Sequence, residues 1–255
     1  MPLGGSLDSQ LENRYRELFE RYDAQGNYIF TDFLDLAALS ALHACLPRLP
    51  RVPYTLFGGT EGCERKILRL GSREECGYEA PFPIACVHIS PASAKFAEDL
   101  SHRDYLGAVM NLGFERDLTG DLVIRGEGAY LFCLDRIAPY IMENLFQVRR
   151  TSVRCSILPQ LPEGDLFRLK RQTVQLSSVR LDALIAHVFR LSRSDAQALF
   201  AQSRVFVDGR ECRDTGFTPG EGQILSVRGF GRMKYVGVES LSKKGKSNTA
   251  VDLFF

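Results

Sequence analysis

Apolar residues along positions 7–22 recur every three to four residues with charged residues between them, which predicts an amphipathic helix. Its apolar positions are Leu11, Tyr15, Leu18, Phe19 and Tyr22. A second helix is predicted over residues 34–46, with Thr31-Asp32 as its start signal, and strands are predicted over 52–57 and 67–70. These elements predict a small α/β lobe at the N-terminus.

The periodicity changes after Pro81–Pro83. Alternating apolar residues there predict strands over 84–89, 121–125, 129–134 and 152–158. Helices are predicted after Ser101, where Ser101 and Asp104 make a capping-box pattern, and from Asp135 to Phe146. The resulting β-α-β-β-α-β order is ferredoxin-like, and the RNA-recognition motif (RRM) shares it.

Two aromatic residues, Tyr130 and Phe132, alternate along one face of the strand predicted over 129–134. In an RRM such residues stack on bases, so both are candidate RNA contacts. Arg103 and Arg125 are basic candidates in the same predicted domain. The competing interpretation is that a neighbouring domain covers this face of the sheet, in which case the two rings are core.

The C-terminal part of the chain predicts two short helices on a small sheet. Leu181, Leu184, Ile185, Val188 and Phe189 form an apolar helical stripe, and Ser192 with Asp195 predicts the start of a second helix. Asp208-Gly209 predicts a hairpin turn after the strand 205–207, and a further strand is predicted over 224–227.

Charge is unevenly distributed along the 255 residues, although the formal net charge is only +1. Residues 166–255 carry 15 Lys and Arg against eight Asp and Glu, whereas residues 1–165 carry 17 basic and 23 acidic side chains. A basic C-terminal third on an acidic body suggests that the C-terminal part binds a polyanion.

Five short motifs in this basic region carry a family resemblance. They are Arg180-Leu181-Asp182, Leu191-Ser192-Arg193, Gln197-Ala198-Leu199, Val205-Phe206-Val207-Asp208-Gly209 and Glu221-Gly222-Gln223-Ile224-Leu225. Together they resemble the αL RNA-binding domain named after small-subunit ribosomal protein S-four, whose two helices hold structured RNA. The resemblance implies RNA contacts at Arg180, Arg193, Gln197 and Arg204. The sequence departs from that family at Ser203, where glycine is usual, and at Gln223, where aspartate is usual.

Further motifs resemble the YlmH family of ribosome-associated proteins. They are Phe57-Gly58-Gly59 with Glu64-Arg65-Lys66, Ser101–Gly107 with Asn111-Leu112-Gly113 and Gly120-Asp121, and Leu225–Arg232. The resemblance implies a multidomain α+β protein with an N-terminal α/β lobe (1–78), an RRM-like RNA-binding middle domain (79–172) and an S-four-type domain with a basic tail (173–255). It also implies a role in translation or in the rescue of stalled ribosomes, with tRNA and rRNA as ligands.

The segment after the S-four-type motifs adds candidates on physical grounds. Arg228, Arg232 and Lys234 flank a Gly-Phe-Gly loop that can approach an RNA backbone closely, and Phe230 is available for stacking. The tail residues Lys243, Lys244 and Lys246 add a basic run that can increase nonspecific phosphate affinity.

The sequence favours a noncatalytic RNA-binding protein that engages the large ribosomal subunit, expected as a monomer without cofactor or metal. An RNA-modifying enzyme of the pseudouridine synthase or methyltransferase class, docked by the same domain, is the alternative. However, no Gly-x-Gly-x-x-Gly loop and no nucleophile–base pair at a meaningful spacing occurs. A third class is an adaptor whose acidic N-terminal lobes dock a protein.

Cysteine spacing and hydropathy indicate the cellular compartment in which the protein is expected. The seven cysteines include no C-x-x-C pair, which argues against a zinc ribbon or a thioredoxin-type redox site and favours small buried side chains in a reducing compartment. No apolar run approaches the ~18 residues of a membrane span, and no secretory signal starts the chain. We therefore expect a soluble, cytoplasmic protein.

Overall fold

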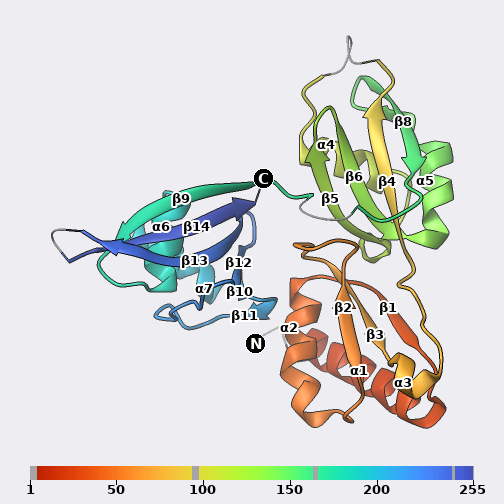
Figure 1. The fold of residues 1–255 in the computed structure, drawn as a ribbon, viewed down its shortest axis with the longest axis horizontal. Helices are drawn as coiled ribbons and strands as arrows, with labels where there is room; N and C mark the ends of the chain where they lie inside the picture. Colours follow the sequence, from red (N-terminus) through yellow and green to blue (C-terminus); the bar gives the residue numbers. More distant parts are fainter. Residues whose placement is uncertain (1–4, 94–97, 163–165, 243–244, 255) are drawn as a thin grey trace. The chain divides into compact units, whose positions relative to one another are not determined.

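The computed structural model describes residues 5–93, 98–162, 166–242 and 245–254, which fold as a mixture of helices and antiparallel sheets (Figure 1). The chain divides into two compact units. The first comprises the residues up to 38 together with 44–166, and the second comprises residues 39–43 together with those from 167 onward. The fold is therefore α+β, as the sequence predicts.

The first unit begins with a lobe built on a three-stranded antiparallel sheet in the order β1-β3-β2. Its elements are α1 (Gly5–Gln25), β1 (Ile29–Leu34), α2 (Leu36–Cys45), β2 (Tyr54–Phe57), β3 (Lys66–Leu70) and α3 (Arg73–Cys76). The predicted helix start at Thr31-Asp32 is wrong, because both residues belong to β1, which pairs with the central strand β3. Instead, Asp35 caps α2, where its carboxylate accepts a hydrogen bond from the Ala38 amide at 2.9 Å.

The middle of the chain forms a five-stranded antiparallel sheet in the order β5-β6-β4-β8-β7. Its elements are β4 (Ile84–Pro91), α4 (His102–Met110), β5 (Thr119–Arg125), β6 (Gly128–Leu134), α5 (Ala138–Asn144), β7 (Gln147–Val148) and β8 (Thr151–Ile157). Apart from the short β7, these elements follow the predicted β-α-β-β-α-β order, and the Ser101–Asp104 capping box is confirmed. One helix boundary is wrong: Asp135 opens a 3-10 turn, and α5 starts at Ala138, where Pro139 fits the first turn.

The N-terminal lobe binds the middle sheet through a buried arginine and an aspartate. The Asp121 carboxylate accepts hydrogen bonds from the backbone amides of Glu64 and Arg65, at 2.6 and 3.2 Å. The Arg65 guanidinium donates to the carbonyl oxygens of Thr119 and Phe33, at 3.0 and 3.1 Å. Burial lowers the pKa of Arg65, so this network is held in a largely dry interface.

The same lobe covers part of the middle sheet with apolar contacts. Phe132 is fully buried, and Gly59 lies so close that a Cβ added there would be 2.3 Å from the phenyl ring. Gly59 also has a φ of +109°, a conformation that favours glycine. The turn between the strands β2 and β3 therefore also serves as a packing surface for Phe132.

The second unit is a six-stranded antiparallel sheet, in the order β11-β10-β12-β13-β14-β9, packed with two helices. Its elements are β9 (Leu169–Leu176), α6 (Leu181–Val188), α7 (Arg193–Ala201), β10 (Val205–Val207), β11 (Arg210–Glu211), β12 (Ile224–Val227), β13 (Gly231–Leu241) and β14 (Ser247–Phe254). The two predicted helices and the Asp208-Gly209 turn are present, with φ of +49° and +79° at the turn residues. The strands β9, β13 and β14 were not predicted, and β9 crosses the predicted domain boundary at residue 172.

All seven cysteines are free thiols, and four of them, Cys45, Cys63, Cys86 and Cys133, are buried. Burial raises the pKa of both Cys86 and Cys133 to about 12, so these thiols stay protonated near neutral pH. Within the part of the chain that the structure describes, no helix combines the length and the apolar character needed to cross a membrane.

The contact between Gly59 and Phe132 predicts the effect of a single methyl group. Gly59→Ala should lower the free energy of unfolding by about 3 kcal/mol, because it forces a side chain into both a filled space and a left-handed backbone. Gly107→Ala, on α4 with no heavy atom within 4 Å, is the control and should stabilise by up to about 1 kcal/mol. Urea unfolding followed by circular dichroism measures both, and equal effects of the two substitutions would contradict the packing role.

Candidate nucleic-acid interface

The two helices of the second unit present the residues that the sequence singled out. The apolar side of α6 is fully buried at Leu181, Leu184 and Ile185, which fixes the orientation of the helix on the sheet. At the start of α7, the Ser192 hydroxyl accepts a hydrogen bond from the Asp195 amide at 3.1 Å, so the predicted N-cap is confirmed. Packing therefore fixes α6, and an N-cap fixes the start of α7.

A buried carboxylate gathers three of the predicted RNA contacts. Asp182 has no exposed surface. It accepts two hydrogen bonds from the Arg180 guanidinium, at 3.0 and 3.1 Å, and one from the Gln197 side chain at 3.0 Å. The Arg193 guanidinium nitrogen lies 3.9 Å from the same carboxylate. Arg180, at the N-cap of α6, and Gln197, on α7, are thus oriented by one side chain, and Arg193 lies at ion-pair distance from it.

The charge state of Asp182 follows from these partners. Burial acts to raise its pKa, but hydrogen bonds from Arg180, Gln197 and the Ala183 amide outweigh burial, and the pKa lies below its ordinary value. In turn, Asp182 raises the pKa of Arg180. The carboxylate is therefore ionised at neutral pH and holds the Arg180 guanidinium in a defined geometry, with the Arg193 guanidinium at ion-pair distance.

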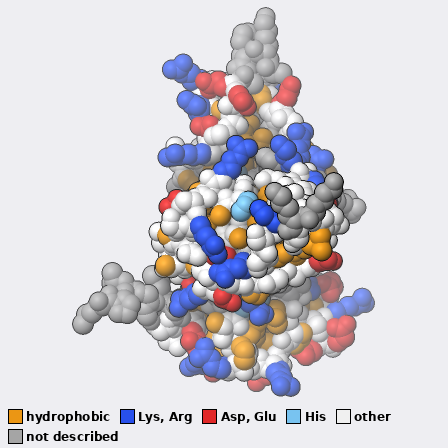
Figure 2. Space-filling view, turned by 90° about the vertical axis from the view of Figure 1, so that its left-hand side faces the viewer, with side chains coloured by type: hydrophobic (Ala, Val, Ile, Leu, Met, Phe, Trp, Pro, Cys, Tyr) orange, Lys and Arg blue, Asp and Glu red, His pale blue; other side chains and the backbone are white. Residues whose placement is uncertain are grey.

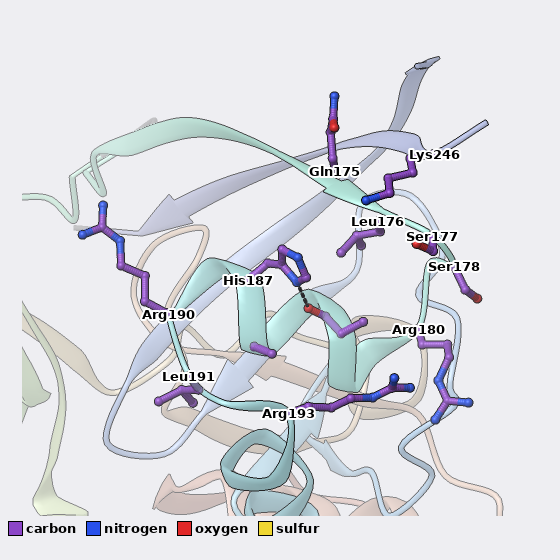
Figure 3. Close-up of a pocket in the computed structure, with 12 residues that line it drawn as sticks. Gln175, Leu176, Ser177, Ser178, Arg180, His187, Arg190, Leu191, Arg193 and Lys246 are labelled. Atoms are coloured by element: carbon purple, nitrogen blue, oxygen red, sulfur yellow. Dashed lines mark hydrogen bonds between the residues drawn. The ribbon is translucent and has the colours of Figure 1, made fainter. Parts of the chain in front are cut away.

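Beside this cluster lies a groove of about 500 Å³ between α6 and the end of β9 (Figure 3). Four basic side chains line it: Arg180, Arg190, Arg193 and Lys246. In Figure 3, Arg193 extends toward Arg180 below α6, while Arg190 lies at the other end of the helix. None of the twelve described residues that line the groove is Asp or Glu. We call this site the basic groove, and its chemistry suits a chain of phosphates.

One histidine belongs to the basic groove. The Nδ1 atom of His187 lies 2.9 Å from the Ala183 carbonyl oxygen, and this nitrogen must carry the proton because a carbonyl only accepts. Nε2 is then the ring nitrogen left for a ligand. Figure 2 shows a histidine among basic side chains on the face of the molecule that it displays.

A second basic cluster lies on the loop between β12 and β13. The Arg204 guanidinium donates from Nε to the Arg228 carbonyl oxygen at 2.9 Å and lies 5.5 Å from the centre of the Phe230 ring. Phe230 is 41% exposed and its ring also contacts Phe189, at the C-terminal end of α6. Arg204 therefore supports the loop that presents Phe230.

The two departures from the family pattern both have structural partners. Ser203 adopts a φ of +53°, the conformation for which glycine is suited, and its hydroxyl donates to the Glu211 carboxylate at 2.7 Å. The Gln223 side chain donates to the Asp208 carboxylate at 2.8 Å and accepts from the Gly220 amide at 2.8 Å. Both departures thus affect turns rather than the basic groove.

Two predicted contacts lie away from the basic groove. Met233 and Tyr235 face the helices, so Arg232 and Lys234, which alternate with them along β13, face the other side of the sheet. The Arg232 guanidinium lies 4.8 and 4.7 Å from the ring centres of Phe167 and Phe254. Lys234 is half-buried and lies opposite Asp252 on the neighbouring strand.

The four candidate RNA contacts in the middle domain differ in their exposure. Phe132 cannot stack on a base because it is fully buried, and for this ring the competing core interpretation is correct. Tyr130 is only half-buried, and its ring stacks on His88. Arg103 and Arg125 are exposed, and the Arg125 guanidinium donates to the Leu166 carbonyl oxygen at 3.3 Å.

Sequence reasoning missed Asp182, Arg190 and His187 as parts of the site. Asp182 had a detectable signal, since it is an acidic residue next to the apolar stripe of α6 and follows Arg180 by two positions. Arg190 and His187 had none, because only the fold places them beside β9. Of the basic tail, Lys246 lines the basic groove, whereas Lys243 and Lys244 lie outside the described residues.

Comparisons with known proteins give the following relatives. Residues 78–160 match the family model described as "Putative RNA-binding domain in YlmH". Over 193 residues the chain is 31% identical to "Ribosome-associated protein quality control protein P2" of Bacillus subtilis, covering 74% of this chain and 73% of that protein. Among solved structures, "Cell division protein ylmH from Streptococcus pneumoniae" has 21% identity and a TM-score of 0.47, covering 60% of this chain and 92% of that one.

The hydrogen bonds to Asp182 predict a pH-dependent contribution to stability. Asp182→Asn should lower the free energy of unfolding by about 2–3 kcal/mol at pH 7, because it removes a buried, charge-assisted network. A lowered carboxyl pKa stabilises the fold at pH values above the ordinary value of 3.8, and this contribution is lost as the pH falls toward the lowered value. The difference between wild type and variant should therefore shrink below about pH 4.

Urea titrations at a series of pH values measure this difference. Glu221→Gln, at an exposed carboxylate of the same unit, is the isosteric control and should leave the free energy of unfolding unchanged. A difference between wild type and Asp182→Asn that stays constant down to pH 3 would show that the Asp182 charge does not stabilise this site.

Proposed function

Since the chain belongs to the YlmH family, we propose that it is a noncatalytic RNA-binding protein that holds structured rRNA or tRNA on the large ribosomal subunit. The C-terminal unit acts in this proposal as an S-four-type domain, and the β-α-β-β-α-β part acts as the RRM-like domain. The proposed setting is the cytoplasm, in translation or in the quality control of stalled ribosomes, with the protein acting as a monomer.

The observation that carries the proposal is the basic groove with its buried carboxylate. Arg180, oriented by Asp182, and Arg193, at ion-pair distance from the same carboxylate, line a groove to which Arg190 and Lys246 add two further positive charges. Guanidinium groups present planar pairs of N–H donors that match phosphate oxygens. Because Arg180 is already ordered, less conformational entropy is lost when RNA binds.

The mode of recognition follows from the side chains present. Arginine and lysine contacts to phosphates fix position without reading sequence, so the proposed ligand is recognised by its backbone shape. Arg204 and the exposed ring of Phe230 extend this surface from the C-terminal end of α6. The result is electrostatic docking with steep salt dependence.

The comparisons support a binding function over catalysis. The names of the matched family and relatives describe an RNA-binding domain and a ribosome-associated protein, not an enzyme. The relative from B. subtilis is named for ribosome-associated quality control, which motivates the proposed setting. No observation among the described residues favours the RNA-modifying enzyme as a second candidate.

Salt titrations test the basic groove. Arg180→Gln combined with Arg193→Gln should weaken binding to unfractionated tRNA roughly 10–100-fold at 0.1 M salt, because two phosphate contacts are lost. The slope of log affinity against log salt should fall by about 1.4–1.8, at ~0.7–0.9 per contact. Fluorescence anisotropy measures both quantities, and Arg210→Gln with Arg213→Gln is a control of equal charge on an exposed hairpin.

A companion variant separates RNA contact from folding. Arg190→Gln with Lys246→Gln removes two exposed groove charges that have no part in the network around Asp182, so the fold should be unchanged and the salt slope should again fall. If the control pair, or a Lys243/Lys244 pair from the tail, weakens binding as much as the groove variants do, the basic groove is not the RNA site.

Cosedimentation tests the ribosomal setting. In sucrose gradients of cell lysate, the wild-type protein should migrate with the large ribosomal subunit, whereas an Arg180/Arg190/Arg193→Gln variant should stay at the top. Circular dichroism verifies that the variant is folded. Wild-type protein that stays at the top at low salt would refute ribosome docking and would leave free RNA as the ligand.

A further inference from the structure

One face of the middle sheet is fully buried in one half and only partly buried in the other. On the side that carries Phe132 and Cys86, both side chains are fully buried and the N-terminal lobe covers them through Gly59. Further along the same strands, Tyr130 and His88 point to the same face, since strand residues alternate, but they are only half-buried. The covering lobe thus leaves this second half of the face accessible.

The accessible half carries an aromatic stack. Tyr130 and His88 are direct cross-strand partners on β6 and β4, and their rings are stacked with centres 4.7 Å apart and planes at 28°. Gly128 lies beside the pair, and a Cβ added there would meet the Ile89 carbonyl oxygen first and would be 3.2 Å from Nε2 of His88. The backbone of Gly128 therefore packs closely against β4 beside the histidine ring.

Polar and basic side chains surround this stack on the same face. Ser156 is the cross-strand partner of His88, and Arg154 is the partner of Ser90, two residues further along β4. Arg125 lies on the other flank, on β5, two residues after Val123, the partner of Tyr130. Arg125, Arg154 and Ser156 are all exposed. The carboxylate of Asp121, earlier on β5, is occupied by the amides of Glu64 and Arg65.

We propose that the His88–Tyr130 stack, flanked by Arg125 and Arg154, binds an unpaired base of single-stranded RNA. The base adds a third ring to the existing stack, and the two arginines hold the phosphates on either side. Stacking of this kind accepts any base, and flanking cations fit the backbone charge. The proposal rests on the proposed function in taking RNA as the ligand, but it uses residues that the basic groove does not contain.

The site differs chemically from the basic groove. The groove has four cations and suits the regular phosphates of a folded RNA, whereas this sheet face has two cations and two rings. Base stacking requires an unpaired nucleotide, because paired bases are already stacked in their helix. The two sites should therefore prefer different RNA substrates and can be tested separately.

The test uses the full chain and a pyrimidine hexaribonucleotide with one central 2-aminopurine, whose fluorescence falls when the base stacks. Wild type should quench it, and Tyr130→Ala should weaken binding about tenfold, while Tyr130→Phe keeps the ring and the quenching. Tyr140→Ala is the matched control, because Tyr140 is an exposed tyrosine on α5 of the same domain. Arg154→Gln, at an exposed residue, should weaken binding without loss of quenching at saturation.

The outcomes separate this proposal from the proposed function. If wild type does not quench the probe, or if Tyr130→Ala quenches as wild type does, the stacking site does not exist. If Tyr130→Ala does not fold, His88→Ala decides through the quenching in the same way, and Arg154→Gln decides through the affinity, since unchanged affinity in that variant would contradict the flanking contact. Loss of quenching in the Arg180/Arg193 variant, with Tyr130→Ala unaffected, would assign the single strand to the basic groove. Intact quenching with no tRNA binding by wild type would overturn the proposed function alone.

Discussion

The carboxylate of Asp182 is the constraint on which the candidate RNA surface depends. It is fully buried, so its charge has to be compensated inside the protein, and the donors that compensate it are the side chains predicted to meet RNA. An unpaired buried carboxylate would be costly, and this cost keeps Arg180 and Gln197 in place. The groove is thus preorganised by an internal acid that does not itself line it.

This arrangement fixes an arginine side chain before RNA binds, which reduces the entropy lost on binding. Arginine side chains lose considerable rotamer entropy when they are fixed, and an isolated surface arginine would lose it only upon RNA binding. Here, folding fixes Arg180 through two hydrogen bonds, and only part of its donor fork is used by Asp182. The remaining donors can contact phosphate oxygens. Arg190 and Lys246 have no such support, and we expect them to contribute long-range attraction more than geometry.

Three local signals in the sequence predicted the local structure correctly, whereas the helix starts predicted at Thr31-Asp32 and Asp135 were wrong. The Ser101–Asp104 and Ser192–Asp195 caps and the Asp208-Gly209 turn are read from neighbouring residues, and all three are present. The strands β13 and β14 were missed, although they form a hairpin with each other. The strands β1 and β9 were missed as well, because they pair with strands that are distant in the sequence. For example, β14 pairs with β9 over a separation of about 80 residues, as Asp252 does with Arg171.

The candidate site shows the same division between local and non-local information. Arg180, Arg193 and Gln197 were predicted from short motifs, but only the packing of α6 against α7 brings Gln197 to the carboxylate of Asp182. Conversely, Tyr130 and Phe132 are equivalent in the sequence pattern, and only the position of Gly59 distinguishes the accessible ring from the buried one. Whether a strand face is exposed depends on which other part of the chain covers it. The alternation of residues along the strand does not predict this covering.

The uneven charge of the chain indicates why two kinds of RNA contact would be needed. Residues 1–165 carry an excess of acidic side chains, so this part repels RNA at distances within the Debye length of ~8 Å at physiological salt. A contact there cannot rely on charge alone and needs stacking beside its flanking arginines, and salt affects stacking little. Residues 166–255 have the opposite excess and can attract phosphates directly. Rising salt should therefore weaken the basic groove first and leave base stacking as the more selective interaction.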